Sequence, residues 1–150
     1  MADFEVLPDL KFNRGPVADP QQYAQDAGAA SWLYFCGEEF AAMEGGMSYE
    51  QVQAAVPVSE QIVSDPPRVL DLDLVEQHIE ALDRLPRPTL VTCRMGPRSS
   101  AVVYLYSGLR AGASADDVLA RADADQAPFA GNDELRDLVR TGLERFSSAG

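Results

Sequence analysis

The side chains best suited to chemistry in this 150-residue chain lie in one short stretch, Cys93-Arg94-Met95-Gly96-Pro97-Arg98-Ser99. A thiolate is a strong nucleophile, and a thiol at a helix N-terminus or beside a cation loses its proton near neutral pH. Arg98 presents a planar fork of N–H donors that matches two oxygens of a phosphate or sulfate group. We therefore expect Cys93 to be a nucleophile and Arg98 to hold an oxyanion.

The rest of this stretch predicts a loop that binds the anion with its main chain. N–H groups at the start of a helix have no intrahelical partner, and the helix dipole favours negative charge there. The Ser99 hydroxyl can cap the helix or donate to the cysteine sulfur when that sulfur becomes a leaving group. The loop residues expected to contact the substrate are Arg94, Met95, Gly96, Pro97 and Ser99.

Two elements must position this loop. The apolar, β-branched run 88–92 predicts a strand that delivers Cys93, and the pattern from Ser99-Ser100 onward predicts a buried helix that ends at Gly112. The alternative for Cys93 is a buried structural thiol, which is common for cysteine at a strand end. That alternative gives no reason for the Arg-Met-Gly-Pro-Arg sequence that follows.

The remaining patterns alternate between strands and helices. An extended edge strand is predicted within 4–12, a short apolar strand at 31–36, and a weak strand at 56–63. Helices are predicted from their caps at 20–27, 48–55, 73–85, 115–124 and from Asn132 onward, with a glycine-containing loop at 37–47. This alternation predicts a three-layer α/β domain with a central, mostly parallel sheet flanked by helices. The length and the 46% hydrophobic content favour a single domain over residues 1–150.

The Cys93–Ser99 stretch resembles the Cys-Arg-Ser-Gly-x-Arg-Ser loop of the beta-lactamase-hydrolase-like family of small cysteine phosphatases, which are related to dual-specificity protein tyrosine phosphatases. The passage from Gly15 through Phe35 is also similar to the opening of that family. The resemblance implies a cysteine-phosphatase-like fold and hydrolysis of phosphomonoesters through a cysteinyl-phosphate. It further implies a phosphorylated small molecule or a phosphoprotein as the substrate, with no metal or organic cofactor.

A cysteine phosphatase also needs a carboxylic acid that protonates the leaving oxygen. In the resembled family this aspartate lies on the loop before a helix, and the corresponding stretch here is Ser64-Asp65-Pro66-Pro67-Arg68. Asp65 is the predicted general acid, and Asp71 is the alternative. Asp65 could instead be a turn residue without a catalytic role, since Asp-Pro is a common turn sequence. His78, on the helix that follows, is expected at the surface or at the rim of the site.

Two other functions remain open from the sequence. Four residues separate Cys93 from Arg98, whereas the general phosphatase pattern has five, and the loop is also similar to that of rhodanese sulfurtransferases. The same thiolate would then carry a sulfane sulfur as a persulfide. The third possibility is a phosphate-binding or interaction module without catalysis.

The composition limits the partners that we expect. A formal net charge of −12 disfavours nucleic acid and anionic membranes, because both require basic patches. No apolar run approaches the roughly 18 residues of a membrane span, and the first residues lack the basic start of a signal peptide. We therefore expect a cytoplasmic protein that binds neither nucleic acid nor membrane. Two cysteines and one histidine are too few for a zinc cluster, and the oligomeric state is left open.

Cys36 is a possible redox partner of Cys93. Both cysteines end short apolar strands, and neighbouring strands lie about 4.8 Å apart, within the roughly 4.4–6.8 Å between Cα atoms that a disulfide accepts. A disulfide with Cys36 would protect an oxidised Cys93 from further oxidation. The alternative is a core position for Cys36 that faces away from the loop, because a change of one residue in register turns a side chain to the other face.

Overall fold

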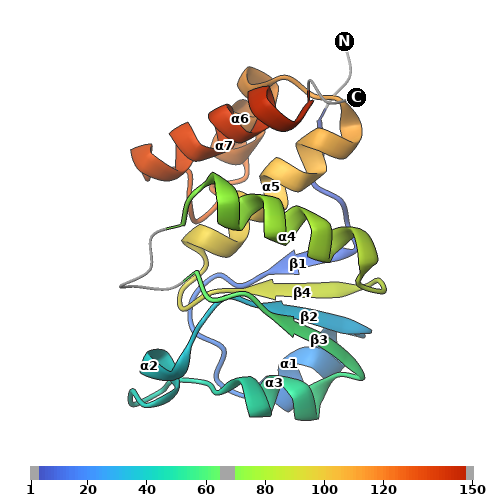
Figure 1. Cartoon of the computed structure of the whole chain (residues 1–150), viewed down its shortest axis with the longest axis vertical. Coiled ribbons are helices and arrows are strands. Elements are labelled where there is room, and N and C mark those ends of the chain that lie inside the picture. The colour runs from blue at the N-terminus through green and yellow to red at the C-terminus, as the bar shows by residue number, and fades with distance from the viewer. Residues whose placement is uncertain (1–3, 65–69, 148–150) are drawn as a thin grey trace.

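A four-stranded parallel sheet forms the centre of the computed structural model, which describes residues 4–64 and 70–147 (Figure 1). The spatial order of the strands is β1-β4-β2-β3, so β4 and β2 are central. All three strand pairs are parallel. The strands are β1 (Leu10–Phe12), β2 (Ser31–Tyr34), β3 (Val58–Gln61) and β4 (Thr89–Thr92).

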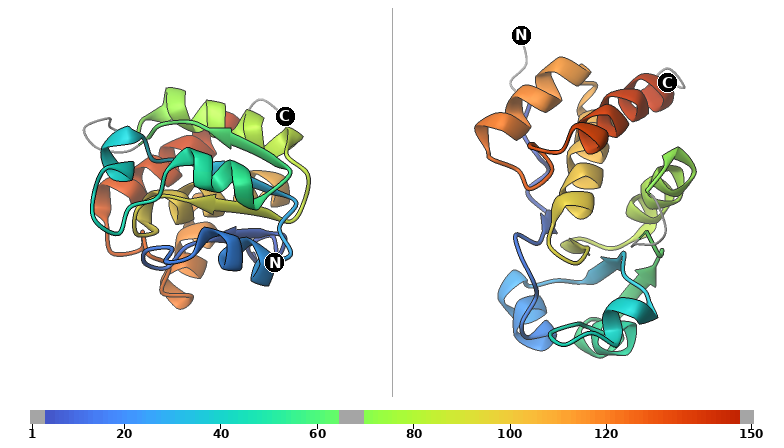
Figure 2. Two further views of the ribbon diagram at one scale, coloured as in Figure 1. Left: turned by 90° about the horizontal axis from the view of Figure 1, so that it is seen from below. Right: turned by 90° about the vertical axis from the view of Figure 1, so that its left-hand side faces the viewer.

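Helices cover both faces of the sheet, which confirms the predicted three-layer α/β fold (Figures 1 and 2). One face carries α1 (Pro20–Ala27), α2 (Glu38–Ala41) and α3 (Tyr49–Ala55). The other carries α4 (Leu72–Arg84), α5 (Pro97–Ala111), α6 (Ala115–Ala124) and α7 (Asp133–Ser147), with α6 and α7 packed outside α5. Within the described ranges, no helix combines the length and apolar character needed to cross a membrane.

The central strands are buried on both faces, so their sequences do not alternate between core-facing and solvent-facing residues. Because successive side chains of a strand point to opposite faces, Trp32 and Tyr34 pack toward one helical layer, while Leu33 and Phe35 pack toward the other. Cys93 follows β4 and belongs to the core that contains α4 and α5. The sheet thus presents the cysteine on the α4–α5 side.

Local capping signals position several helices as predicted. The Asp19 side chain accepts a hydrogen bond from the Gln22 amide at 3.1 Å, and Gly28 ends α1 in the left-handed conformation at φ 61°. Ser48 and Gln51 form a reciprocal capping box at the start of α3. These helices are therefore specified by residues close in sequence.

Several boundaries differ from the prediction, and strands β2 and β3 are shorter than predicted. The loop predicted at 37–47 contains the single-turn helix α2. Helix α4 begins at Leu72 because Asp71, rather than Asp73, caps it by accepting a hydrogen bond from the Leu74 amide at 3.0 Å. Helix α5 begins at Pro97, two residues before the predicted start, since proline suits the first position of a helix.

Candidate active site

The loop between β4 and α5 wraps around the sulfur of Cys93. The Cys93 Sγ accepts a hydrogen bond from the Gly96 amide at 3.1 Å and another from the Ser99 amide at 3.4 Å. The Ser99 hydroxyl lies 3.4 Å from the same sulfur. The thiol is 5% exposed and lies at the start of a 15-residue helix, where negative charge is stabilised.

Gly96 gives the loop its shape. Its φ of +118° is rare for a residue with a side chain, and a Cβ there would lie 2.1 Å from the carbonyl oxygen of Asn13. Pro97, which has no N–H group, follows as the first residue of α5. The main chain therefore turns sharply enough to direct the Gly96 and Ser99 amides at the sulfur.

Asn13, just after β1, holds this loop to the sheet. Its buried side-chain amide donates to the carbonyl oxygen of Cys93 at 2.9 Å, and its carbonyl oxygen accepts from the Cys93 amide at 3.2 Å. The same oxygen accepts a hydrogen bond from the Ser99 hydroxyl at 2.9 Å. The Gly15 amide adds a main-chain bond to the Met95 carbonyl at 2.7 Å. Nothing near Asn13 in the sequence signals this role, because Cys93 lies 80 positions away.

The two arginines of the loop contact different parts of the structure. Arg98 donates through Nη1 to the main-chain carbonyl of Ser64, at the end of the segment that follows β3. Arg94 instead stacks over the Phe40 ring, 5.4 Å from its centroid, and donates to the Met43 sulfur at 3.3 Å. Arg98 thus contacts the segment after β3, while Arg94 packs against the segment around α2.

His78 supports the Ser64 segment from inside the core. The histidine is fully buried, so its predicted place at the surface or rim is wrong; α4 turns it inward, where it stacks on Phe35 with 4.2 Å between ring centroids. Its Nε2 lies 2.9 Å from the Ser64 hydroxyl, which donates to the Ile62 carbonyl at 3.0 Å. Burial lowers the pKa of His78 to about 3, so the ring is neutral. Its Nδ1 has no hydrogen-bond partner among residues 4–64 and 70–147.

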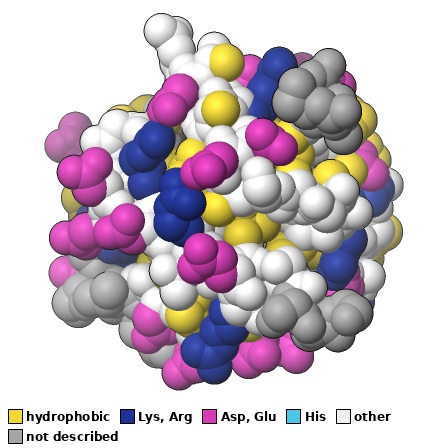
Figure 3. All heavy atoms as spheres, turned by 90° about the horizontal axis from the view of Figure 1, so that it is seen from above, with side chains coloured by type: hydrophobic (Ala, Val, Ile, Leu, Met, Phe, Trp, Pro, Cys, Tyr) yellow, Lys and Arg dark blue, Asp and Glu magenta, His cyan; other side chains and the backbone are white. Residues whose placement is uncertain are grey.

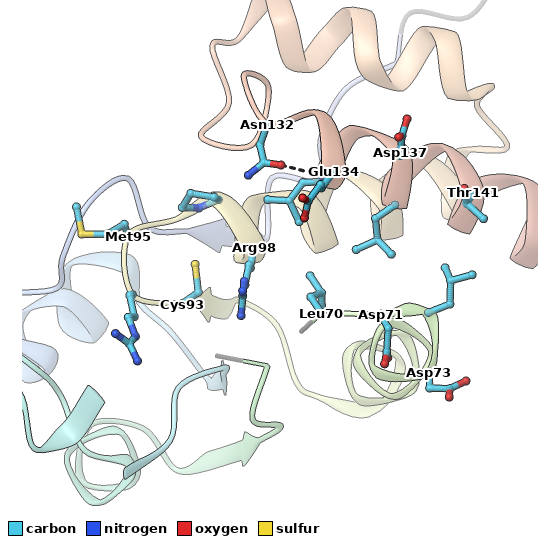
Figure 4. A pocket seen from close by; sticks show the side chains of 15 residues that line it. Leu70, Asp71, Asp73, Cys93, Met95, Arg98, Asn132, Glu134, Asp137 and Thr141 are labelled. Atoms are coloured by element: carbon cyan, nitrogen blue, oxygen red, sulfur yellow. Dashed lines mark hydrogen bonds between the residues drawn. The ribbon is translucent and has the colours of Figure 1, made fainter. Parts of the chain in front are cut away.

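A pocket of about 830 Å³ opens at the loop and extends between α4 and α7 (Figure 4). Cys93 and Arg98 line one end of it, together with Arg94, Met95 and Pro97. Asp71, the alternative acid, lies on the pocket wall and also caps α4. The predicted acid Asp65 lies outside the described residues.

Cys36 and Cys93 occupy different cores. Both are thiols, and Cys36 is fully buried among the side chains that pack between the sheet and α1 and α3. Cys93 packs on the α4–α5 side of the sheet. The described residues contain no group of three or more histidine, cysteine or carboxylate side chains that could hold a metal ion.

No protein family model and no curated protein sequence matches the chain. Its fold is nevertheless similar to solved structures. Tk-PTP in its active form aligns with a TM-score of 0.70 at 14% identity, over 91% of this chain and 92% of that chain. Human DUSP28 aligns with a TM-score of 0.63 at 20% identity, over 98% of this chain and 99% of that chain.

The core catalytic domain of the PP-IP phosphatase SIW14 from S. cerevisiae is a third similar structure. Its TM-score is 0.65 at 14% identity, over 99% of this chain and 92% of that chain. All three are small cysteine phosphatases of the dual-specificity and tyrosine phosphatase type. The chain therefore has the fold of these phosphatases, which confirms the fold that the resemblance implied.

Proposed function

We propose that the chain is a cysteine-dependent phosphatase that hydrolyses phosphomonoesters. The observation that carries this proposal is the convergence of the Gly96 and Ser99 amides on the Cys93 sulfur at the start of α5, next to Arg98. Donors fixed in this way stabilise a thiolate before substrate binds, and they stabilise the charge on a transferring phosphoryl group. The phosphatase fold of the chain supports the same conclusion.

In the first step the Cys93 thiolate attacks phosphorus, an S–P bond forms, and the bond from phosphorus to the alcohol oxygen breaks. Asp65, with Asp71 as the alternative, gives its proton to that oxygen. Arg98 and the main-chain N–H groups of the loop hold the non-bridging oxygens of the phosphoryl group. These loop contacts are assigned to Arg94, Met95, Gly96 and Ser99, while Pro97 contributes only shape because it has no N–H group.

In the second step water attacks phosphorus and the S–P bond breaks. The aspartate, now ionised, accepts the proton of the water, and the electron pair returns to sulfur as a thiolate. The Ser99 hydroxyl lies 3.4 Å from the sulfur and stabilises this leaving thiolate when its one proton turns from the Asn13 side-chain oxygen to the sulfur. The products are inorganic phosphate and the regenerated thiolate enzyme.

Turnover of para-nitrophenyl phosphate by the purified protein tests this proposal. We expect Cys93→Ser to abolish turnover and Arg98→Lys to reduce kcat/KM by roughly 100-fold, since lysine cannot make the bidentate contact. The variants Asp65→Asn and Asp71→Asn identify the general acid. Replacement of the residue that acts as the acid should remove the alkaline limb of the pH–rate profile, which is the fall in rate at high pH. Undiminished turnover in Cys93→Ser would exclude the mechanism.

Sulfur transfer is the second candidate, favoured by the four-residue spacing between Cys93 and Arg98. Mass spectrometry after incubation with thiosulfate distinguishes the two. A stable gain of one sulfur on Cys93 without phosphatase turnover would favour a persulfide carrier. Phosphate binding without either reaction would indicate a non-catalytic module.

A further inference from the structure

The pocket continues beyond the loop as a groove with an apolar floor. Its volume of about 830 Å³ lies in the range of pockets that hold whole small ligands, and a phosphoryl group fills only a small part of it. The floor between α4 and α7 consists of leucine side chains, two of them less than 10% exposed. They are Leu70, Leu72, Leu135 and Leu138. This groove therefore fits an apolar body attached to the phosphate.

One face of α7 forms the long wall of the groove (Figure 4). The lining residues Glu134, Asp137, Leu138 and Thr141 have the i, i+3, i+4, i+7 spacing of a single helix face. The seven-residue span from Glu134 to Thr141 covers about 10 Å along the helix axis. Three residues of an extended chain have about the same length. The wall is thus long enough for about three residues of an extended peptide.

Arginine side chains of α7 lie on the side that faces α6, and carboxylates lie on the side that faces the pocket. Arg136 and Arg140 turn toward α6, where they pair with Asp123 at 2.7 Å and Asp116 at 3.0 Å. Figure 3 shows arginine and acidic side chains interspersed on this outer surface, without a continuous basic patch among the described residues.

On the pocket side, the carboxylates of α7 have no cationic partner in the part of the chain that the structure describes. Glu134 and Asp137 make no ion pair or side-chain hydrogen bond with the described residues, and neither does Asp73 across the groove on α4. Among the described residues that line the pocket, the cations are Arg98, which lies at the loop, and Arg94, which stacks on Phe40. Away from the loop, the described wall is therefore negative.

We propose that the groove binds a peptide whose phosphorylated side chain enters the loop and whose neighbouring residues are basic. This inference rests on the proposed function and specifies its substrate. An aryl phosphate places its ring over the leucines, while lysine or arginine side chains on adjacent residues reach Glu134 and Asp137. A substrate with further phosphate groups meets carboxylates in the same place and is disfavoured.

Short peptides that carry one phosphotyrosine flanked by lysine, glutamine or glutamate test this proposal. We expect kcat/KM to be about 3- to 10-fold higher for the lysine peptide than for the glutamine peptide. The glutamate peptide should have a lower kcat/KM than the glutamine peptide. The differences in kcat/KM among the three peptides should shrink as the salt concentration is raised. The double variant Glu134→Gln/Asp137→Asn should lose this preference. The matched variant Asp133→Asn/Glu144→Gln removes the same charge from exposed positions of α7 outside the pocket and should keep it.

Binding to the Cys93→Ser protein separates this inference from the proposed function. A preference for the lysine peptide in binding, without turnover by the wild type, would support the groove assignment and refute the phosphatase assignment. Turnover that is equal for the three peptides would overturn the groove assignment alone. Faster turnover of an inositol pyrophosphate or of an aminoalkyl aryl phosphate than of the lysine peptide would overturn the peptide as occupant.

Discussion

The side chain of Asn13 forms two hydrogen bonds with the main chain of Cys93, donating to its carbonyl at 2.9 Å and accepting from its amide at 3.2 Å. An amide side chain carries a donor and an acceptor on separate atoms, so it can make both bonds at once. Since the two residues are 80 positions apart, this pair ties the loop after β4 to the end of β1. The orientation of the nucleophile thus depends on a residue outside the loop.

Replacing Asn13 with alanine should lower both stability and activity. Each buried polar group left without a partner costs about 1–3 kcal/mol, so we expect a loss of roughly 3 kcal/mol in unfolding free energy. We also expect kcat/KM to fall at least 10-fold, because the loop loses its attachment to the sheet. Urea denaturation and aryl phosphate hydrolysis measure the two effects.

Gln22→Ala, at an exposed amide bonded to Asp26, is the control and should change stability by less than about 0.5 kcal/mol. Wild-type turnover in Asn13→Ala would refute this role.

Gly96→Ala should damage the loop more than other glycine substitutions do. The added Cβ would meet the Asn13 carbonyl oxygen at 2.1 Å, and φ +118° adds strain of about 1–3 kcal/mol. We expect the amide to turn away from the sulfur and phosphatase turnover to fall more than 10-fold. Gly131→Ala is the control, because its Cβ would meet no atom within 4 Å. Equal activities of the two variants would show that the turn at Gly96 is not needed.

Sequence reasoning succeeded where the determining contacts are local. Asp19 and Gly28 specify both ends of α1, and Ser48 with Gln51 specifies the start of α3, so these helices could be placed from neighbouring residues. The strand–loop–helix order around Cys93 is local in the same sense.

Sequence reasoning failed where partners come from distant segments. The burial of His78 depends on Phe35 and Ser64, which lie on segments that only the folded sheet brings together. Asn13 acts on a loop 80 residues away. At α4, Asp71 and Asp73 are both good capping residues, and the path of the main chain decides between them.

The reactivity of Cys93 provides a test that needs no substrate. Because the sulfur accepts two amide hydrogen bonds at the start of α5, we expect iodoacetamide to alkylate Cys93 faster than it alkylates a free thiol such as glutathione under the same conditions. A Cys36→Ser background leaves Cys93 as the single thiol, so that the measured rate belongs to one residue. Alkylation of Cys93 no faster than that of the free thiol would contradict the nucleophile assignment.

The pairing of Cys36 with Cys93 under oxidation remains a prediction. Peroxide should convert Cys93 to a sulfenic acid, which the Cys36 thiol then traps as a disulfide that dithiothreitol reverses. Because the two thiols pack in different cores, formation of the bridge requires the loop after β4 to rearrange. Non-reducing peptide mapping after peroxide treatment detects the cross-link. Loss of activity while Cys36 stays a thiol would refute the pairing.

His78 should make the stability of the protein depend on pH between about 3 and 6.5. Burial lowers the folded-state pKa of His78 to about 3, whereas an unfolded histidine titrates near 6.5. In this window the unfolded chain binds a proton that the folded chain does not, so stability is complete above about pH 6.5 and falls as the pH decreases. At pH 5 the difference amounts to about 2 kcal/mol.

Denaturation of the wild type and of His78→Phe at several pH values isolates this contribution. Phenylalanine can stack on Phe35 without titrating, so the stability of the variant should decline less steeply between pH 6.5 and 5. Since His78 is the single histidine of the chain, NMR of its ring protons gives a second readout that does not depend on the folding of a variant. The ring signals of the native protein should not shift between pH 7 and 4. Titration of these signals near pH 6.5 would contradict the burial of a neutral His78.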